Sequence, residues 1–430
     1  MTYNEAVEYL FNSAPLFQNI GAGAYKEGLS NTLALDGHFG HPHRSYKTIH
    51  VAGTNGKGSV SHTLAAILQS AGYRVGLYTS PHLIDFRERI RVNGEMIPKE
   101  RVVEFVENDR SFFEPLHPSF FELATALAFK YFEEAKVDVA VIEVGLGGRL
   151  DCTNIINPVV SIITNISFDH VQFLGDTLEK IAGEKAGIIK GNTPVVIGET
   201  SGNQGVKQVF LNKALNCNAP IRFADEEHHE PISDAQLKGL CQEKNSQTIL
   251  TSLDVLRDLQ RVSDTSLKFA QKDIEQGFRH VCDMTGLMGR WQKIQDNPRV
   301  ICDTGHNTGG WQYLSKQLEG LSNHLKPSET PEIAKSSLHI IIGMVGDKDV
   351  RSVLSMMPKN AWYYFTQASV KRAMPVSEFA AIARENGLSG EEYPSVQEAY
   401  HTALAKAGQE DTIFIGGSTF IVADFMSEIK

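Results

Sequence analysis

Alternating apolar and polar segments divide the chain into strands and helices from about residue 46 onward. An apolar run at 48–52 predicts a strand, and the next apolar positions recur at the spacing of a helix, at Val60, Leu64, Ile67 and Leu68. Further apolar runs, several of them β-branched, predict buried strands at 74–78, 137–142, 159–163 and 194–197. Helical patterns lie among them at 121–132 and 178–188. This alternation predicts an α/β fold with a mainly parallel sheet.

A second α/β pattern begins near residue 297. Its predicted strands are 299–302, 338–345, 362–366 and 412–415, and its predicted helices are 308–320, 376–386, 395–406 and a last one after Ser418. Before it lie a polar stretch at about 200–235, which we interpret as surface structure that holds no metal, and a predicted helix at 245–259. A chain of 430 residues is too long for one typical core. We therefore predict two domains, 1–292 and 297–430.

The glycine-rich segment after the first strand predicts a phosphate-binding loop. Residues 50–59 read HVAGTNGKGS. Glycines let backbone N–H groups approach phosphates, the following helix N-terminus favours negative charge, and Lys57 can reach the outer phosphates. The spacing departs from the standard loop, which has four residues between its glycines and Ser or Thr directly after Lys, so a plain GTPase or kinase is disfavoured. The alternative, a glycine-rich turn with a solvated lysine, fits the flanking strand and helix less well.

Polar residues follow the ends of three other predicted strands. Ser80 follows the strand that ends at 78, Glu143 follows 137–142, and His170 comes after the strand that ends at 163. Ligands of open α/β sheets lie beyond the carboxyl ends of the strands. A hydroxyl, a carboxylate and an imidazole there can hold Mg²⁺, although histidine is an unusual ligand for this ion, and alone His170 reads as a hydrogen-bonded loop residue. Glu143 closes a buried strand, which is costly unless the acid is paired or bound to metal.

Composition narrows the class of protein. The formal net charge of -10 argues against broad nucleic-acid binding, and anionic substrates would need a locally basic site. Arg87, Arg89 and Arg91 could form such a site on one face of a strand, or could line a solvated edge. No apolar run is long enough to span a bilayer, no secretory signal is evident, and the five cysteines lack metal-ligand spacing. These features predict a cytoplasmic protein with reduced thiols.

Several further motifs follow the loop in order. They are TSPH at 79–82, VIEVGLGGRLD at 141–151, TNISFDH at 164–170, IAGEKAGI at 181–188 and DTGHN at 303–307. With HVAGTNGKGS they make the chain resemble folylpolyglutamate synthase, including the bifunctional dihydrofolate synthase form, within the Mur ligase superfamily. The resemblance implies a Mur-ligase-type P-loop domain and a Rossmann-like C-terminal domain. It also implies ATP-dependent ligation of L-glutamate to dihydropteroate or folate through an acyl phosphate.

The resemblance assigns roles to individual residues. It implies nucleotide contacts for Asn55, Gly56, Lys57, Gly58, Ser59, Asn245, Arg290 and Asp303. It implies Mg²⁺ ligation by Ser80, Glu143 and His170, and catalytic roles for Lys57, His170 and Lys185. Pterin contacts are implied for Phe121, Glu122, Leu123, Ala124 and Thr125, and a substrate contact is implied for His306. The chain departs from the family pattern at three positions near these residues, Cys241, Met288 and Gly305.

Lys185 matches a lysine that is carbamylated in this family. A carbamate would convert a cation into an anion that could serve a second Mg²⁺, so two magnesium ions are expected. An unmodified lysine that neutralises phosphate is the alternative, and the sequence does not decide between them.

Two rival functions follow from the same motifs. Another Mur-type ligase acting on UDP-muramyl substrates normally carries a UDP-binding N-terminal domain, whereas only about 45 residues precede the loop here. A regulatory ATPase without ligase activity would turn over ATP independently of pterin and glutamate. We expect a monomer whose partners are a pterin or folate substrate and L-glutamate, with no nucleic acid and no membrane.

Overall fold

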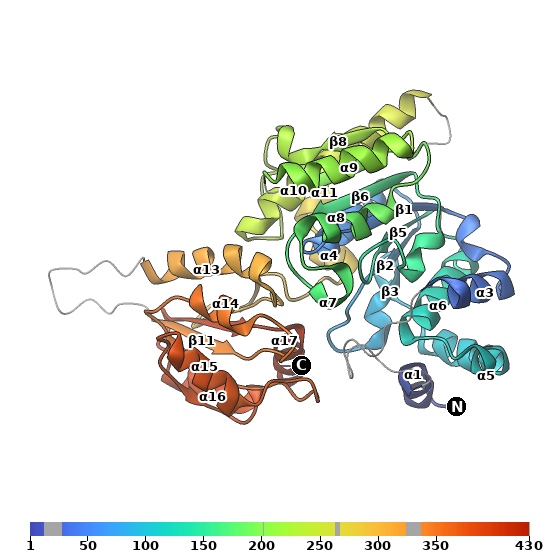
Figure 1. The fold of residues 1–430 in the computed structure, drawn as a ribbon. Coiled ribbons are helices and arrows are strands. Elements are labelled where there is room, and N and C mark those ends of the chain that lie inside the picture. Colours follow the sequence, from blue (N-terminus) through green and yellow to red (C-terminus); the bar gives the residue numbers. More distant parts are fainter. Residues whose placement is uncertain (13–27, 201, 263–266, 324–336, 430) are drawn as a thin grey trace. The chain divides into compact units, whose positions relative to one another are not determined.

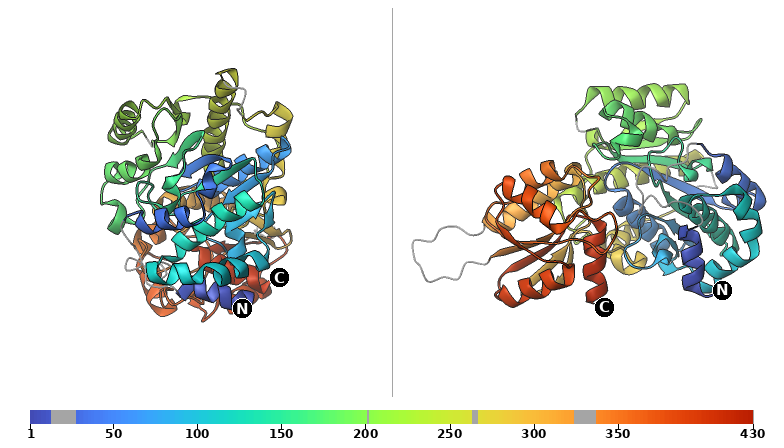
Figure 2. Two further views of the ribbon diagram at one scale, coloured as in Figure 1. Left: turned by 90° about the vertical axis from the view of Figure 1, so that its right-hand side faces the viewer. Right: turned by 60° about the horizontal axis from the view of Figure 1, so that its bottom comes forward.

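The computed structural model describes residues 1–12, 28–200, 202–262, 267–323 and 337–429, and it forms two compact units (Figures 1 and 2). The first comprises Met1–Gln236 and Gln242–Leu287, and the second comprises Leu237–Cys241 and Met288–Lys430. The first unit thus ends before residue 292. The reason is that β9 (Gln292–Gln295) pairs antiparallel with β10 (Arg299–Cys302) and so belongs to the second sheet.

The first unit is built on an eight-stranded sheet. Its strands lie in the order β4 (Glu95–Met96), β3 (Ile90–Val92), β2 (Val75–Tyr78), β5 (Val139–Glu143), β1 (Lys47–Ala52), β6 (Val160–Asn165), β7 (Val195–Glu199) and β8 (Ile221–Phe223). From β2 to β8 all neighbours are parallel, and β3 and β4 add an antiparallel edge. The predicted α/β fold with a mainly parallel sheet is confirmed.

Helices cover both faces of this sheet (Figure 1). One face packs against α4 (Lys57–Ser70), α10 (Leu240–Val262) and α11 (Gln271–Arg279), and α12 (Val281–Thr285) contacts α4 beside them. The other face packs against α1 (Tyr3–Asn12), α3 (Ser30–His38), α5 (Lys99–Leu116), α6 (Phe120–Glu134), α8 (Leu178–Lys185) and α9 (Gln204–Asn216). Alternate residues of the central strands, such as Val51 and Ala52, enter opposite cores. Burial on both faces explains why these strands read as continuous apolar runs.

The second unit is a smaller α/β layer structure. Its six strands lie in the order β13 (Gly390–Glu392), β12 (Trp362–Phe365), β11 (Leu338–Ile342), β14 (Thr412–Gly416), β10 and β9. The helices are α13 (Thr308–Asn323), α14 (Val350–Ser355), α15 (Val376–Glu385), α16 (Val396–Lys406) and α17 (Thr419–Glu428). All but β9 pair in parallel, as a Rossmann-like domain requires. None of the described helices combines the length and apolar character needed to cross a membrane.

The arginine cluster differs from both predictions. Arg87 and Arg89 lie in a 3-10 turn (Phe86–Arg89), and only Arg91 lies on β3, so the three do not share a strand face. Asp85 caps this turn and accepts hydrogen bonds from the Arg87 guanidinium, which breaks the extended pattern. Arg89 and Arg91 are buried, so a solvated edge is wrong as well.

Candidate active site

The predicted phosphate loop connects β1 to α4. The strand ends at Ala52, the helix begins at Lys57, and Gly56 caps it in the left-handed region with φ 84°. A Cβ atom at Gly56 would lie 2.2 Å from the Asn245 Oδ1 atom, and one at Gly53 would lie 1.9 Å from the Thr164 Oγ1 atom. Both glycines are therefore required by close approach and by their positive φ, which is 144° at Gly53.

Substitution of Gly56 by alanine is expected to weaken ADP binding at least tenfold. A left-handed alanine costs about 1–2 kcal/mol, and the added methyl group would displace the Asn245 amide. Titration calorimetry with ADP and Mg²⁺ would measure the change. Gly183→Ala is the matched control, because Gly183 lies in α8 with open space around its Cα, and an equal loss in both variants would contradict this role of Gly56.

The loop is fixed to the end of the neighbouring strand β6. The backbone N–H of Thr54 donates to the Asn165 carbonyl at 3.0 Å, and that of Asn55 donates to the Asn165 side chain at 2.8 Å. The Thr164 hydroxyl donates to the Asn55 carbonyl at 2.5 Å, and the Asn55 amide donates to the Ser167 hydroxyl at 3.2 Å. Asn55 thus contributes through its backbone and its side chain to a preorganised loop.

Two lysines converge on the same carbonyl group of this loop. The Lys57 Nζ atom donates to Gly53 O at 3.0 Å and to Thr54 O at 3.1 Å, and the Lys185 Nζ atom donates to Gly53 O at 2.9 Å. Lys185 comes from the last turn of α8 and is buried. Burial, with a smaller contribution from the positive Lys57, lowers the pKa of Lys185 to about 7. The loop therefore carries a local positive charge in a protein that is acidic as a whole.

The three predicted metal ligands lie at strand ends along one edge of the sheet. Glu143 is the last residue of β5, Ser80 follows β2, and His170 follows β6, and these strands are near neighbours in the order β2, β5, β1, β6. Ser80 donates its backbone N–H to a Glu143 carboxylate oxygen at 3.4 Å. The His170 Nε2 atom lies 3.8 Å from a carboxylate oxygen of Asp169, which is itself largely buried. Ser80 and Glu143 are thus brought together, and His170 stands beside a further carboxylate.

Asn245, one of the residues implied to contact the nucleotide, lies against the loop at Gly56. Asn245, in the first turns of α10, donates to the Gln242 Oε1 atom at 2.9 Å, and the Gln242 Nε2 atom lies 3.3 Å from the Ser59 hydroxyl. All three side chains are buried. Gly58 and Ser59 lie in the first turn of α4, where free backbone N–H groups can meet an anion. Gln242 was missed in the sequence, and its position three residues before Asn245 on one helix face could have indicated it.

The predicted residues of the second unit surround the turn that follows β10. Asp303 accepts the backbone N–H of Trp291 at 2.7 Å and of Gly305 at 2.8 Å. Burial raises the pKa of the Asp303 carboxyl, and the positive Arg290 offsets part of this effect. The Arg290 guanidinium donates to the Thr304 hydroxyl, and the His306 Nδ1 atom lies 3.1 Å from the Thr304 carbonyl. Asp303 and His306 therefore belong to one hydrogen-bonded turn, and Arg290 is bonded to it through Thr304.

The five predicted pterin-side residues occupy the first turns of α6. Glu122 closes a capping box with Ser119, and Thr125 bonds the Tyr78 hydroxyl at 3.1 Å. Leu123 and Ala124 are fully buried in the core, so they can support a ligand wall but do not face an open site. Phe121 is partly exposed, and its ring packs so closely on Gly145 that a Cβ atom there would lie 2.5 Å from the ring.

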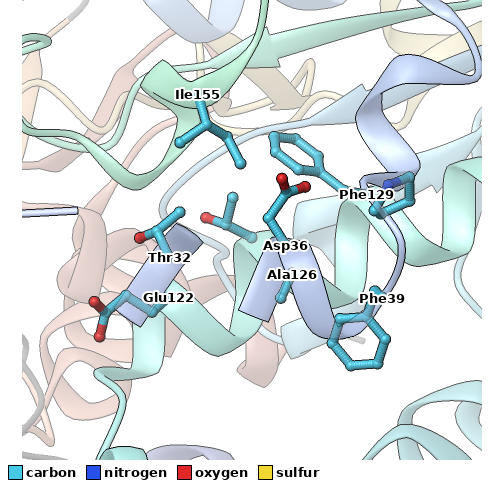
Figure 3. Close-up of a pocket in the computed structure, with 9 residues that line it drawn as sticks. Thr32, Asp36, Phe39, Glu122, Ala126, Phe129 and Ile155 are labelled. Carbon is cyan, nitrogen blue, oxygen red and sulfur yellow. The ribbon is translucent and has the colours of Figure 1, made fainter. Parts of the chain in front are cut away.

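A small pocket lies between α3 and α6 (Figure 3). The empty space there is about 240 Å³, a volume that includes open solvent. The lining residues are Thr32, Asp36, Phe39, Pro42, Glu122, Thr125, Ala126, Phe129 and Ile155. The Asp36 carboxylate already pairs with the Nδ1 atoms of His41 at 2.6 Å and His43 at 2.7 Å. The pocket is below the usual size of a ligand site. Two of the predicted pterin-side residues, Glu122 and Thr125, nevertheless line this pocket.

One cluster with metal-ligand residue types lies between the polar stretch and α10. Ligand atoms of Glu227, His229 and Asp254 lie within 4.8 Å of one another. Arg222, however, donates two hydrogen bonds of 2.7 Å to Glu227, and Arg257 donates one of 3.1 Å to Asp254. Because both carboxylates are already neutralised by guanidinium groups, we interpret the cluster as surface ion pairs, as the sequence suggested.

Two domain families match the chain. Residues 51–253 match the Mur ligase middle domain, and residues 289–419 match the Mur ligase, glutamate ligase domain. The dihydrofolate synthase/folylpolyglutamate synthase of Bacillus subtilis is 31% identical over 427 residues, which cover 94% of this chain and 95% of that protein. The probable bifunctional folylpolyglutamate synthase/dihydropteroate synthase of Haloferax volcanii is 32% identical over 99% of this chain, which spans 50% of its length.

Solved structures agree over the whole chain. The E. coli FolC in complex with DHPP and ADP superimposes with a TM-score of 0.84 at 28% identity, covering 100% of this chain and 98% of that one. A bifunctional folylpolyglutamate synthase/dihydrofolate synthase with Mn, AMPPNP and L-glutamate bound gives a TM-score of 0.81 at 27% identity, with coverage of 100% and 98%. The chain therefore belongs to the folylpolyglutamate synthase/dihydrofolate synthase family of Mur ligases.

Proposed function

We propose that this chain uses ATP to join L-glutamate to the carboxylate of a pteridine substrate, either dihydropteroate or a folate. The observation that carries the proposal is the cationic phosphate loop, where Lys57 and Lys185 both donate to the Gly53 carbonyl. Related proteins bind the matching ligands, which are DHPP with ADP in one structure and AMPPNP, Mn and L-glutamate in another.

The reaction needs an activated carboxylate, because a carboxylate oxygen is a poor leaving group. An oxygen of the substrate carboxylate attacks the γ-phosphorus of ATP, the bond to the β-γ bridging oxygen breaks, and ADP leaves. The glutamate amine then attacks the acyl carbon, a C–N bond forms, phosphate departs and the amine loses a proton. The first step joins two anions, so placement and positive charge matter more than a protein nucleophile. Lys57 and the N–H groups of α4 provide that charge.

Ser80, Glu143 and His170 would hold Mg²⁺ in this scheme. The donor set fits, because Glu143 is a buried carboxylate at a strand end beside Ser80, and such a group needs a positive partner. Bound Mg²⁺ would neutralise charge on the phosphate oxygens. A second ion would require a carbamate on Lys185.

Glu143→Gln is expected to raise the Mg²⁺ concentration for half-maximal ligation at least tenfold. The amide keeps the shape of the side chain but removes the charge that attracts the ion. Initial rates measured across a Mg²⁺ series would show the shift. Glu104→Gln, an exposed carboxylate on α5, serves as the control, and an unchanged Mg²⁺ dependence in Glu143→Gln would mean that Glu143 is structural.

We assign ATP binding to the first unit and glutamate ligation to the second. The nucleotide contacts in the first unit would include Asn55, Gly56, Gly58, Ser59 and Asn245. Arg290 and Asp303 would contact the nucleotide and His306 a substrate. This is supported by the turn after β10, where Thr304 contacts both Arg290 and His306 and Asp303 accepts two backbone N–H groups. Phe121, with Glu122 and Thr125 from the pocket of Figure 3, would form the pterin side. The monomeric state and the cytoplasmic location stay predictions.

A product assay separates this function from its rivals. Dihydropteroate and reduced folates would be supplied side by side with ATP, Mg²⁺ and L-glutamate, and glutamate adducts would be detected by mass spectrometry. The ligase proposal expects adduct and ADP in equal amounts. ADP formation that is independent of pteridine and glutamate would support the regulatory ATPase instead, and adducts only with UDP-muramyl substrates would support the other Mur-type ligase.

A further inference from the structure

A buried chain of hydrogen bonds runs from the centre of the first sheet to the glycine-rich turn after β5. It begins at His50, in the middle of β1, whose Nε2 atom lies 2.8 Å from the Thr153 hydroxyl. The Thr153 hydroxyl donates to the Asp151 Oδ1 atom at 2.5 Å. All three residues are buried, and His50 and Thr153 have no exposed surface. None of the three has a role in the reaction proposed above.

The direction of these hydrogen bonds determines which ring nitrogen of His50 carries the proton. The single hydroxyl proton of Thr153 is donated to Asp151, so the same oxygen must accept from His50 Nε2–H. The His50 Nδ1 atom is buried without a hydrogen-bond partner among the described residues, which suits an unprotonated nitrogen better than an N–H group. Burial, and to a lesser extent Lys190, lowers the pKa of His50 to about 3, so the ring is neutral.

Asp151 connects these hydrogen bonds to the glycine-rich turn. Its Oδ1 atom also accepts the backbone N–H of Thr153 at 2.9 Å, and its Oδ2 atom accepts those of Gly145 at 3.0 Å and Leu146 at 2.9 Å. The carboxylate thus receives four hydrogen bonds, two of them from the turn. Only Val144 separates that turn from Glu143, and its Gly145 packs closely against the Phe121 ring. It therefore connects the proposed metal ligand with the proposed pterin-side aromatic residue.

We propose that His50 and Thr153 are positioning residues, which orient Asp151 and so hold the 145–146 turn in the shape that binds the pteridine substrate. The inference rests on the proposed function, because it takes Phe121 as part of the pterin side. Neither side chain touches substrate in this scheme. His50 acts by donating a hydrogen bond from Nε2–H to the Thr153 hydroxyl oxygen. The hydroxyl proton then has no acceptor except Asp151.

Matched substitutions separate the hydrogen bonds from packing. Thr153→Val keeps the side-chain shape and removes the hydroxyl, whereas Thr153→Ser keeps the hydroxyl. His50→Leu removes the donor, whereas His50→Gln can place an amide N–H near the Nε2 position. We expect Thr153→Val and His50→Leu to raise the Kd for dihydropteroate, measured by pteridine fluorescence with ADP and Mg²⁺ present, at least fivefold. The Kd for ADP should change less than twofold in both.

Two comparisons test that the residues act as one chain. His50→Gln and Thr153→Ser should remain within twofold of the unsubstituted protein, and the double variant His50→Leu/Thr153→Val should bind dihydropteroate no worse than Thr153→Val alone. A structural defect would instead lower the bound fraction for dihydropteroate and ADP alike. Unchanged dihydropteroate affinity in a folded Thr153→Val, or fully additive losses, would overturn the inference.

A second measurement is independent of ligation. In protein labelled with nitrogen-15 at histidine, the His50 signals, assigned by their loss in His50→Gln, should show a protonated Nε2 and an unprotonated Nδ1 without change from pH 5.5 to 9. The opposite tautomer, or titration in this range, would overturn the inference even if the enzyme is a ligase. Dihydropteroate binding without ligation would refute the proposed function and leave this inference standing.

Discussion

Lys57→Ala is expected to lower kcat/KM for ligation at least a hundredfold while the protein stays folded. Lys57 is the first residue of α4, and its Nζ atom donates to the Gly53 and Thr54 carbonyls of the phosphate loop. From there it can move to the outer phosphates, where charge is redistributed as the phosphoryl group is transferred. Loss of one such contact costs about 3 kcal/mol in the transition state, which corresponds to about a hundredfold in rate.

Steady-state kinetics and thermal unfolding together test this expectation. Lys57 donates only to two loop carbonyls, so its removal leaves the core intact and the unfolding midpoint should change little. Lys180→Ala is the control, because Lys180 is an exposed lysine of α8 paired with Asp176 and should keep full activity. Near-normal turnover in folded Lys57→Ala would show that the loop does not use this cation.

The sequence predicted the structure best where the candidate site lies on elements with a strong local pattern. The predicted strand 48–52 and following helix correspond to β1 and α4, because a buried parallel strand and a helix with free N–H groups each leave a strong local signature. The edge that holds Ser80, Glu143 and His170 could also be predicted, since parallel strands end on the same side of a sheet. Their roles as ligands stay predictions.

Other features depend on contacts between residues far apart in the chain. Arg89 resembles a strand residue in a window of alternating charges, yet the Asp85 cap turns the backbone and directs its Nε–H to His82. The chain from His50 to Asp151 spans about a hundred positions, and no local period encodes it. The first unit ends earlier than 292, because β9 pairs with β10. This pairing could not be predicted, because the mostly polar residues of β9 do not form an apolar strand pattern.

Lys185 is expected to be carbamylated in the active enzyme, and Lys185→Ala is expected to lose activity at least a hundredfold. The neutral amine attacks carbon dioxide, a C–N bond forms and one proton is released, so the reaction requires an unprotonated lysine. Burial lowers the pKa of Lys185 to about 7, helped by the positive Lys57, although Asp169 and Asp151 oppose the shift. An ordinary lysine with a pKa of about 10.4 would be almost entirely protonated at pH 8.

The sign of the pH dependence follows from this shift. Below the folded pKa the amine is protonated and cannot react, and as pH rises through about 7 the neutral fraction grows. Activation by bicarbonate should therefore increase from pH 6 to pH 8. The unmodified protein should also become more stable with rising pH between about 7 and 10.5, because the unfolded chain binds the proton more tightly than the folded one.

A carbamate at this position would change the charge of the loop. In the unmodified protein the Lys185 Nζ atom donates to Gly53 O, so the new anion would lie close to the phosphates and repel them unless Mg²⁺ bridges the two. The modification and a second magnesium ion should therefore appear together. Small carboxylates such as acetate or formate should partly restore Lys185→Ala, because they can occupy the vacated space and supply the missing anion.

Carbon-13 bicarbonate offers a direct measurement, since a carbamate gives a signal that should be absent from Lys185→Ala and present in Lys180→Ala. Electron density that ends at a plain amine, in crystals grown with bicarbonate, Mg²⁺ and nucleotide, would count strongly against the modification. Lys185 would then act as a cation on the Gly53 carbonyl, and acetate should not rescue the alanine variant. Full activity of Lys185→Ala would remove any role for this side chain in the reaction.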